Sequence, residues 1–204
     1  QILHGGGIAY GSRYVRKDEV TIVYFGDGAT SKGDFHEAMN FAGIHRLPVL
    51  FFCENNNWAV SMPQRKQMVV QDISIKAENY GFPGVSVDGM NVLEVYRATL
   101  KAAHRAKQGL GPTLIEAKTY RFAAHSSNDD HTLYRAKEDL EMERDSDPIP
   151  KFRQYLIDNS VLSATADSKI LSDVQREVSQ AIEYAEASDN PRPEDATTQV
   201  YSGE

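Results

Sequence analysis

The chain has 204 residues, of which 41% are hydrophobic and 25% charged, and its formal net charge at pH 7 is −7. These values are typical of one globular domain, and they argue against a nucleic-acid-binding surface because no basic stripe is present. The longest apolar run is shorter than the roughly 18 residues that a membrane span requires, and the single cysteine, Cys53, excludes a disulfide framework and indicates a reducing compartment.

Apolar and polar segments alternate from the start of the chain, where "GGGIAYG" (5–11) favours a helix that packs closely against a neighbour. Short apolar runs rich in β-branched and aromatic residues predict buried strands at 20–25 and 47–54, and further strands are expected at 84–87 and 113–120. Helical patterns are expected at 33–46, 72–80 and 91–108. The first of these places Phe35, Met39 and Ala42 on one face, and Asn91 is a suitable cap for the last. The alternation predicts an α/β fold, a parallel sheet with helices on both faces.

The character of the sequence changes after Tyr120. The segment 121–135, "RFAAHSSNDDHTLYR", is polar enough to be a long functional loop. Two or three helical stretches are expected up to about Ser188, and residues 189–204 form a polar tail. We therefore expect one domain over residues 1–204 with a helical C-terminal part. Because the chain begins with Gln and enters a helical pattern almost at once, we also expect a segment upstream of it.

Polar residues follow the first two predicted strands. Asp27, within "GDG" (26–28), supplies a carboxylate, and Asn56 in "ENNNWAVS" supplies an amide oxygen. Both are hard donors suited to Mg²⁺, which completes its octahedron with phosphate oxygens and water. Gly26 and Gly28 allow an anion to approach the backbone, and the amides of residues 29–31 precede a helix. The pattern predicts a Mg²⁺-diphosphate site at two strand ends.

Simpler interpretations exist for each half of this pattern. A lone "GDG" is most often a turn, and so is a run of asparagines after a strand. The combination is more specific, because both segments follow apolar strands that a parallel sheet would bring together. A Walker phosphate loop is excluded: Gly28 and Gly33 have the required separation, but Asp34 stands where that loop needs lysine.

"GDG", 26 intervening residues and "NN" resemble the thiamin diphosphate signature of transketolase-like and 2-oxo acid dehydrogenase enzymes. The similarity continues, in order, through "GDGATSKGDFHEAMNFAG", "NNNWAVS", "VDGMNVLEVY", "PTLIEAKTYR" and "HSSNDDHTLYR". These segments resemble the alpha subunit of the decarboxylating dehydrogenase component of 2-oxo acid dehydrogenase complexes. The resemblance covers residues 1 to about 160 and is weaker beyond. It implies the diphosphate-binding half of a thiamin diphosphate-binding fold.

The resemblance implies a role for individual residues at the two strand ends. Asp27 and Asn56 would bind Mg²⁺ through their side chains, and Trp58 would do so through its backbone carbonyl. Gly28, Ala29 and Asn56 would contact thiamin diphosphate. Glu54 occupies a position that is arginine in some relatives, and a carboxylate there would repel the diphosphate, so Glu54 is not counted as a ligand.

Two residues of the 121–135 loop gain a role from the same resemblance. A lone histidine in a polar loop is usually a solvated side chain, but His125 matches the family's loop histidine. It would therefore contact the cofactor and act as the catalytic residue that supplies a proton or positive charge. Ser126 matches a serine that is phosphorylated in mitochondrial relatives, which makes it a candidate regulatory site.

The activity implied by the resemblance is oxidative decarboxylation of a 2-oxo acid, with acyl transfer to a lipoyl group on the acyltransferase core. The chain would require a beta subunit, in a heterotetramer of two alpha and two beta subunits, and the apolar face of helix 33–46 could serve that interface or the core. It would be cytoplasmic in a prokaryote and lie in the mitochondrial matrix of a eukaryote. The "HSSNDD" loop followed by "YR" favours branched-chain over pyruvate-type substrates. Alternatives are a pyruvate or acetoin dehydrogenase, a transketolase half, and an inactive fragment or non-catalytic cofactor-binding subunit.

Overall fold

The computed structural model describes residues 1–198, so residues 199–204 of the predicted C-terminal tail lie outside the described residues. Contacts along the chain divide it into two compact units, one from Gln1 to Phe152 and one that begins at Arg153. Each unit is considered by itself. The single domain expected from the sequence stays a prediction.

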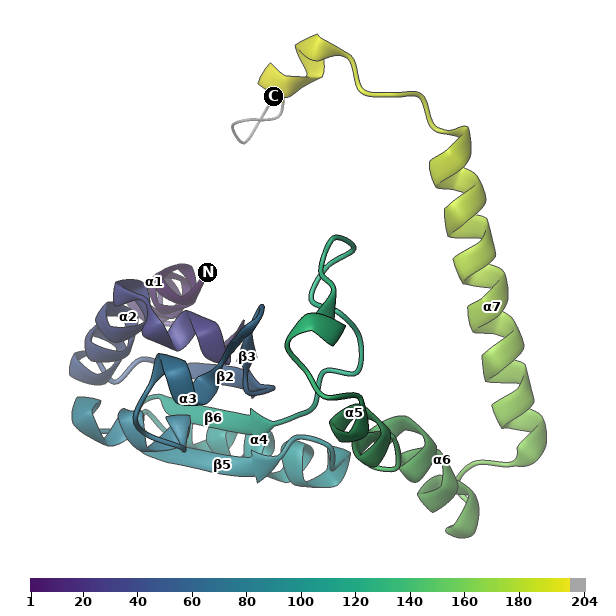
Figure 1. The fold of residues 1–204 in the computed structure, drawn as a ribbon. Helices are drawn as coiled ribbons and strands as arrows, with labels where there is room; N and C mark the ends of the chain where they lie inside the picture. Colours follow the sequence, from purple (N-terminus) through teal and green to yellow (C-terminus); the bar gives the residue numbers. More distant parts are fainter. Residues whose placement is uncertain (199–204) are drawn as a thin grey trace. The chain divides into compact units, whose positions relative to one another are not determined.

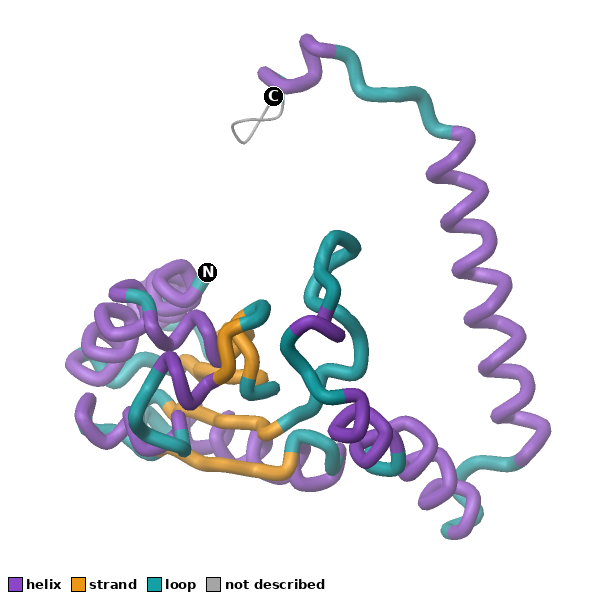
Figure 2. Tube along the Cα trace, viewed as in Figure 1, coloured by secondary structure: helices purple, strands orange, loops and turns teal. Residues whose placement is uncertain are grey.

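A four-stranded parallel sheet forms the centre of the first unit, with the strand order β1-β2-β6-β5 (Figures 1 and 2). Its strands are β1 (Thr21–Gly26), β2 (Val49–Asn55), β5 (Gly84–Asp88) and β6 (Thr113–Lys118). A short antiparallel pair, β3 (Trp58–Ala59) and β4 (Met62–Pro63), follows β2. The predicted parallel sheet is therefore confirmed, and each of its strands overlaps a predicted run.

Helices cover both faces of this sheet, as the alternating pattern predicted. One face packs against α1 (Ile2–Tyr14), α2 (Gly33–Ile44) and the 3₁₀ helix η2 (Ile73–Tyr80), with Phe35, Met39 and Phe51 in the shared core. The other face packs against α4 (Val92–Lys107). Burying a side chain as large as Phe35 or Phe51, both 0% exposed, contributes roughly 1.5–3 kcal/mol to stability. Figure 1 shows α4 on the opposite side of the sheet from α1 and α2.

Local chemistry explains where two of these helices lie. The side chain of Asn91 accepts hydrogen bonds from the amides of Leu93 and Glu94, which confirms it as the cap of α4. In α1, a Cβ at Gly5 would come within 2.8 Å of the Cβ of Val23, so glycine is needed for the helix to touch β1. The glycine-rich start of the chain is thus a closely packed helix.

One sequence-based expectation needs correction. The run 20–25 is not a fully buried strand: β1 is an edge strand, and Ile22 and Tyr24 are 37% and 53% exposed. An apolar run cannot show which strand will lie at an edge. The helix expected at 72–80 is present and is the 3₁₀ helix η2. The apolar face of α2, which could have served an interface or the core, lies in the core.

Beyond β6, the segment 121–135 contains only one short 3₁₀ helix, η3 (His131–Leu133), in accord with the predicted loop. Two or three helical stretches are expected after it, and in the described residues the structure has three, α5 (Lys137–Arg144), α6 (Pro148–Asp158) and α7 (Ala164–Ala187), followed by η4 (Pro193–Thr197). In the second unit, Arg153 pairs with Asp167, whose pKa is lowered by this hydrogen bond. Over residues 1–198, the structure contains no helix with both the length and the apolarity of a membrane span.

Candidate functional site

The two predicted halves of the site lie side by side at the carboxyl ends of β1 and β2. Asp27 directly follows β1 and begins the 3₁₀ turn η1 (Asp27–Ser31), while Asn55 is the last residue of β2. Gly26 is the register partner of Glu54, so the two chains leave the sheet together. Strand β3 then passes against η1, where a Cβ at Gly28 would be only 2.6 Å from the Cβ of Ala59. Glycine at position 28 is what allows this contact.

Asp27 is the most buried charged group at these strand ends, with 1% of its surface exposed. Its Oδ2 accepts a hydrogen bond of 3.4 Å from Nε2 of Gln67, and the backbone amides of Asp27 itself and of Asn56 also act to lower its pKa. Its Oδ1 is buried without a hydrogen-bond partner among the described residues. Burial raises the pKa of Asp27, and the hydrogen bonds and the charge of Arg121 oppose this shift. A buried carboxylate oxygen without a partner favours a cation beside it.

The turn after β2 is built from hydrogen bonds between side chains and backbone. Oδ1 of Asn55 accepts from the amide of Asn57 at 3.0 Å, and Oδ1 of Asn56 accepts from the amide of Trp58 at 3.1 Å. Asn57 has a φ of +65°, a conformation that asparagine tolerates better than most residues. An amide oxygen has two lone pairs, so Asn56 retains one for a further partner.

This donor set fits Mg²⁺ bound together with a phosphate. Among residues 1–198 there is no group of three or more His, Cys, Asp or Glu side chains that could hold a metal ion. A cation beside Asp27 and Asn56 would therefore meet one carboxylate and neutral oxygens, and phosphate would have to supply more charge. Mg²⁺ is commonly bound in this way.

Buried and part-buried hydrogen bonds of Thr30 stabilise the η1 turn. Oγ1 of Thr30 donates to the carbonyl of Asp27 at 2.8 Å and accepts from Nζ of Lys76 at 3.1 Å. Burial lowers the pKa of Lys76. The side chain of Ala29 is partly buried against the core cluster. The predicted contact of Gly28 and Ala29 with a diphosphate stays a prediction.

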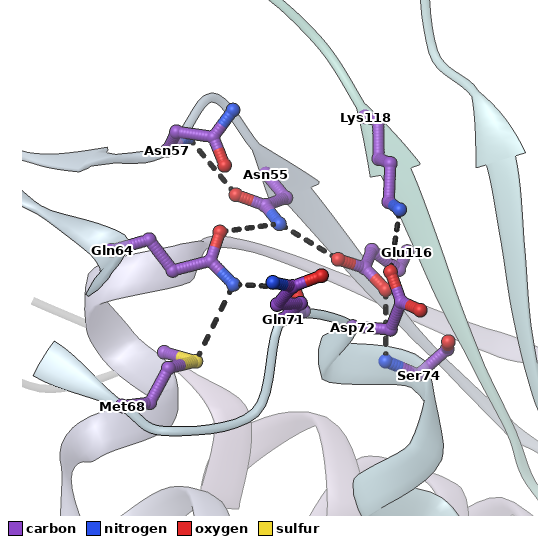
Figure 3. Close-up of polar contacts among 9 residues, drawn as sticks. All are labelled: Asn55, Asn57, Gln64, Met68, Gln71, Asp72, Ser74, Glu116 and Lys118. Atoms are coloured by element: carbon purple, nitrogen blue, oxygen red, sulfur yellow. Dashed lines mark hydrogen bonds and ion pairs between the residues drawn. The ribbon is translucent and has the colours of Figure 1, made fainter.

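A buried polar network lies directly beneath the turn after β2 (Figure 3). The amide nitrogen of Asn55 donates to Oε1 of Gln64 at 3.0 Å and to Oε1 of Glu116 at 2.7 Å. Oε2 of Glu116 accepts from the amide of Ser74 at 2.9 Å, and Nε2 of Gln64 donates to the carbonyl of Gln71 at 2.7 Å. The network joins β2, β6, the short helix α3 (Gln64–Gln67) and the start of η2.

The 121–135 loop approaches the same turn through Arg121. Its Nη2 donates to the carbonyl of Val60, between β3 and β4, at 2.9 Å and to the hydroxyl of Tyr134 at 3.0 Å. That hydroxyl donates to Oδ2 of Asp129 at 2.6 Å. The ring of Tyr134 also lies 5.2 Å from that of Trp58, centroid to centroid. The loop is thus joined to the β3–β4 hairpin (58–63) by side chains from both segments.

His125 lies on the exposed part of this loop. Its backbone amide donates to Oδ2 of Asp129 at 2.7 Å, and its Nδ1 lies 3.4 Å from Nη1 of Arg121. The hydrogen bond from Tyr134, followed by that from the His125 amide, lowers the pKa of Asp129. Ser126 is exposed, and its carbonyl accepts from the amide of Asp129.

The structure therefore brings Asp27, Gly28, Asn56 and Trp58 together and connects the His125 loop to them through Arg121. The catalytic, metal-binding and regulatory roles of these residues stay predictions. Sequence analysis missed the supporting residues, namely Asn55, Gln64, Gln67, Lys76, Glu116, Arg121, Asp129 and Tyr134. Glu116 alone carried a signal, because a charged residue inside the apolar run 113–120 requires a buried partner.

Comparisons with known proteins show which family and which proteins this chain is similar to. Residues 1–194 match the family described as dehydrogenase E1 component. The chain is similar to the 2-oxoisovalerate dehydrogenase subunit alpha of Bacillus subtilis, with 43% identity over 202 residues, which cover 99% of this chain and 61% of the relative. It is also similar to a 3-methyl-2-oxobutanoate dehydrogenase subunit alpha of Mycobacterium tuberculosis, with 45% identity over 83% of this chain and 46% of the relative.

Similarity to a pyruvate dehydrogenase is nearly as strong. The pyruvate dehydrogenase E1 component subunit alpha of Bacillus subtilis is 40% identical over 202 residues, which cover 98% of this chain and 54% of the relative. The chain thus spans between 46% and 61% of the length of these three relatives.

Proposed function

This chain belongs to the dehydrogenase E1 component family, and we propose that it forms the part of an alpha subunit that holds Mg²⁺ and the diphosphate of thiamin diphosphate. One observation carries the proposal: the buried Oδ1 of Asp27 has no hydrogen-bond partner among the described residues and lies beside the Asn56 turn. The oxygen of Asp27, the side chain of Asn56 and the carbonyl of Trp58 would bind the metal. Gly28 and Ala29 would contact the diphosphate, close to the start of α2.

When bound, thiamin diphosphate supplies the electron sink that decarboxylation of a 2-oxo acid requires. The residues of this chain orient the diphosphate end and keep water from Asp27, whose burial strengthens its attraction to a cation. His125 would contact phosphate and hold a proton at its imidazole for the transfer step. The hydrogen bond from its backbone to Asp129 and the contact with Arg121 restrict where that imidazole lies.

For the complete protein we propose oxidative decarboxylation of branched-chain 2-oxo acids with acyl transfer to a lipoyl group on an acyltransferase core. Activity would require a beta subunit in a heterotetramer. Two of the relatives described above are named for 2-oxoisovalerate or 3-methyl-2-oxobutanoate, which supports this substrate class. Pyruvate is the second candidate, because a pyruvate dehydrogenase alpha subunit is 40% identical to this chain.

The test is decarboxylation by the alpha subunit that contains this chain, assembled with its beta partner, Mg²⁺ and thiamin diphosphate. The values of kcat/KM for 2-oxoisovalerate and pyruvate are compared. We expect at least a roughly tenfold preference for the branched acid, about the discrimination that an extra methylene or two gives in an apolar pocket. A preference for pyruvate would retain the family and reject the substrate. Turnover of neither acid, with no binding of Mg²⁺ and cofactor, would instead favour a non-catalytic role.

We also propose Ser126 as a regulatory phosphorylation site. It is exposed, and its carbonyl bonds to the amide of Asp129, so a phosphate there would lie near a carboxylate and compete for Arg121. The expected result is release of the loop from the hairpin. Phosphorylated and unmodified protein can be compared by limited proteolysis of residues 121–135. Equal cleavage rates would argue against this role.

A further inference from the structure

We propose that Glu116 is a positioning residue for the metal-binding turn: acting through Asn55, it fixes the backbone that presents Asn56 and Trp58. This inference rests on the proposed function, because that function makes Asn56 and Trp58 ligands. It assigns a task to a buried carboxylate that lies on a different strand from either ligand-bearing segment.

The position of Glu116 within the sheet is unfavourable for a charged side chain. It lies inside β6 between register partners Cys53 and Ser86, and it is 0% exposed. Leu114, two residues earlier and on the same face, belongs to the core cluster packed under α2 and η2. A carboxylate buried in such a place is costly unless hydrogen bonds satisfy it. Both of its oxygens are satisfied, by the side chain of Asn55 and by the amide of Ser74.

These bonds determine which way the amide of Asn55 faces. Asn55 is 2% exposed, and its nitrogen donates to Glu116 and Gln64 while its oxygen accepts from the amide of Asn57 (Figure 3). Rotating the amide by half a turn would place its oxygen against two acceptors and its nitrogen against an N–H donor. Glu116 therefore keeps the oxygen of Asn55 directed at the turn.

The oxygen of Asn55 matters to the turn after β2 because two bonds from side chains to backbone amides hold this turn. Asn57 has a positive φ, and the amides of Asn57 and Trp58 are held in sequence by the side chains of Asn55 and Asn56. Only the first of these two bonds is anchored in the core. Loss of the bond from the amide of Asn57 to Asn55 would therefore free the segment that carries the two proposed ligands, the side chain of Asn56 and the carbonyl of Trp58.

Glu116 also reaches the other half of the site. It accepts from the amide of Ser74 in the first turn of η2, and Lys76, two residues later, donates to Oγ1 of Thr30 in η1. One carboxylate thus connects the Asn56 turn with the Asp27 turn. A residue that served only to fill space in the core would need neither bond.

The isosteric change Glu116→Gln tests this assignment. A glutamine has one accepting oxygen, so its NH₂ group must face a donor, either the amide of Ser74 or the side chain of Asn55. The reversed pair, Glu116→Gln with Asn55→Asp, restores the bond between the two side chains with opposite polarity, and the carboxylate introduced at position 55 can still accept from the amide of Asn57. The bond to Gln64 is replaced by a contact between two acceptor oxygens, so the recovery should be partial. Ile115→Val, on the opposite face of β6, is the control for a general loss of stability.

Two measurements on the ligand-free 204-residue chain report on the turn directly. Trp58 is the only tryptophan of the chain, so its fluorescence and its quenching by acrylamide follow the turn itself. Hydrogen exchange follows the amide of Asn57. In the wild type we expect slow exchange of that amide. Glu116→Gln should accelerate its exchange and Trp58 quenching, the reversed pair should recover part of the change, and Ile115→Val should leave both unchanged.

In the assembled enzyme, titration with Mg²⁺ in the presence of thiamin diphosphate gives the third readout. We expect Glu116→Gln to weaken apparent Mg²⁺ affinity by about tenfold to a hundredfold, the effect of breaking a hydrogen bond to a charged group. The reversed pair should recover part of this loss, while Ile115→Val keeps wild-type affinity. Wild-type affinity and Trp58 spectra in folded Glu116→Gln would overturn the proposal.

Two further outcomes are decisive. If Glu116→Gln does not fold, the reversed pair and the exchange of the Asn57 amide in the wild type carry the test, and fast exchange there overturns the proposal. If the wild type does not bind Mg²⁺ and thiamin diphosphate, the proposed function fails. The ligand-free measurements still decide whether Glu116 holds the turn.

Discussion

The two segments that carry the candidate residues are held in very different ways. The strand-end half carries Asp27, which is 1% exposed, and Asn56. It is supported by buried hydrogen bonds that Glu116 accepts from Asn55 and Ser74. The loop half, with His125, is exposed and is tied to the hairpin by Arg121 and Tyr134. The first half is fixed by the same packing that folds the sheet, and the second depends on a few polar contacts near solvent.

The difference suits the two segments to different tasks: the strand-end half to holding a ligand in place, and the loop half to moving. A metal and diphosphate site benefits from rigid ligands, because their ordering is achieved when the protein folds. A loop held by a few exposed hydrogen bonds opens at a much smaller cost in free energy. The loop can therefore move without disturbing the residues proposed to bind the metal.

The largest effect is expected from Asp27→Asn in the strand-end half. The change removes the only carboxylate proposed to bind the metal, and we expect Mg²⁺-dependent binding of thiamin diphosphate to weaken at least about 100-fold, as for loss of a charged ligand. Isothermal titration of the assembled enzyme measures it. The fold should survive, because the substitution replaces a buried charge whose pKa is raised by burial with a neutral group of the same shape.

Asp34→Asn is the matched control, because Asp34 lies in the first turn of α2 and is exposed. It should bind the cofactor as the wild type does. Unchanged binding in Asp27→Asn would remove Asp27 from the metal site and with it the observation that carries the proposed function.

The next largest effect is expected from Arg121→Met in the loop half. Arg121 is the side chain that reaches both the carbonyl of Val60 and the hydroxyl of Tyr134, so its loss should detach the loop from the hairpin. We expect turnover to fall about tenfold, the value of one or two hydrogen bonds to a charged group, with little change in Mg²⁺ affinity. Arg144→Met, an exposed change in α5, is the control. Equal losses of turnover and Mg²⁺ affinity would show that the two halves are not separable.

Much of the strand-end half could be predicted from the sequence because its signals are local. Apolar runs located β2 and β6, Asn91 located the start of α4, and Asp27 and Asn56 followed apolar strands. The supporting network could not be predicted in the same way. The partners of Glu116 are 61 and 42 residues away in the chain, and no local pattern pairs them.

The loop half was less predictable for a related reason. Its polarity indicated a loop, but the bond from Arg121 to Val60 spans 61 residues and ends on a backbone carbonyl, which leaves no trace in the sequence. The exposure of β1 was missed because strand order, rather than composition, places it at the edge of the sheet. His125 gained its role through family resemblance alone, since a histidine in a polar segment has no distinctive physical pattern.

A smaller effect is expected from Tyr134→Phe. The ring can still pack beside Trp58, but the hydroxyl that joins Arg121 to Asp129 is lost. We expect faster hydrogen exchange in residues 121–135 and a loss of turnover of no more than about threefold. This is below the loss for Arg121→Met, because Arg121 keeps its bond to the carbonyl of Val60 when the two part-buried bonds of the hydroxyl are lost. Tyr96→Phe, on an exposed face of α4, should change neither. An effect as large as that of Arg121→Met would mean that the hydroxyl, rather than the guanidinium, holds the loop.

A test that needs no substitution is available at Cys53, and it shows whether the strand-end half is as closed as the comparison requires. Cys53 is 0% exposed in β2, and burial raises the pKa of its thiol, with the nearby charges of Asp27 and Glu116 acting in the same direction. Because the thiolate is the reactive form, thiol–disulfide exchange of Cys53 with an added disulfide should be at least about 1,000-fold slower in the native chain than in urea. Stopped-flow labelling with a coloured disulfide reagent measures both rates. Rapid labelling under native conditions would mean that β2 opens readily, and the strand-end half would then be no more rigid than the loop.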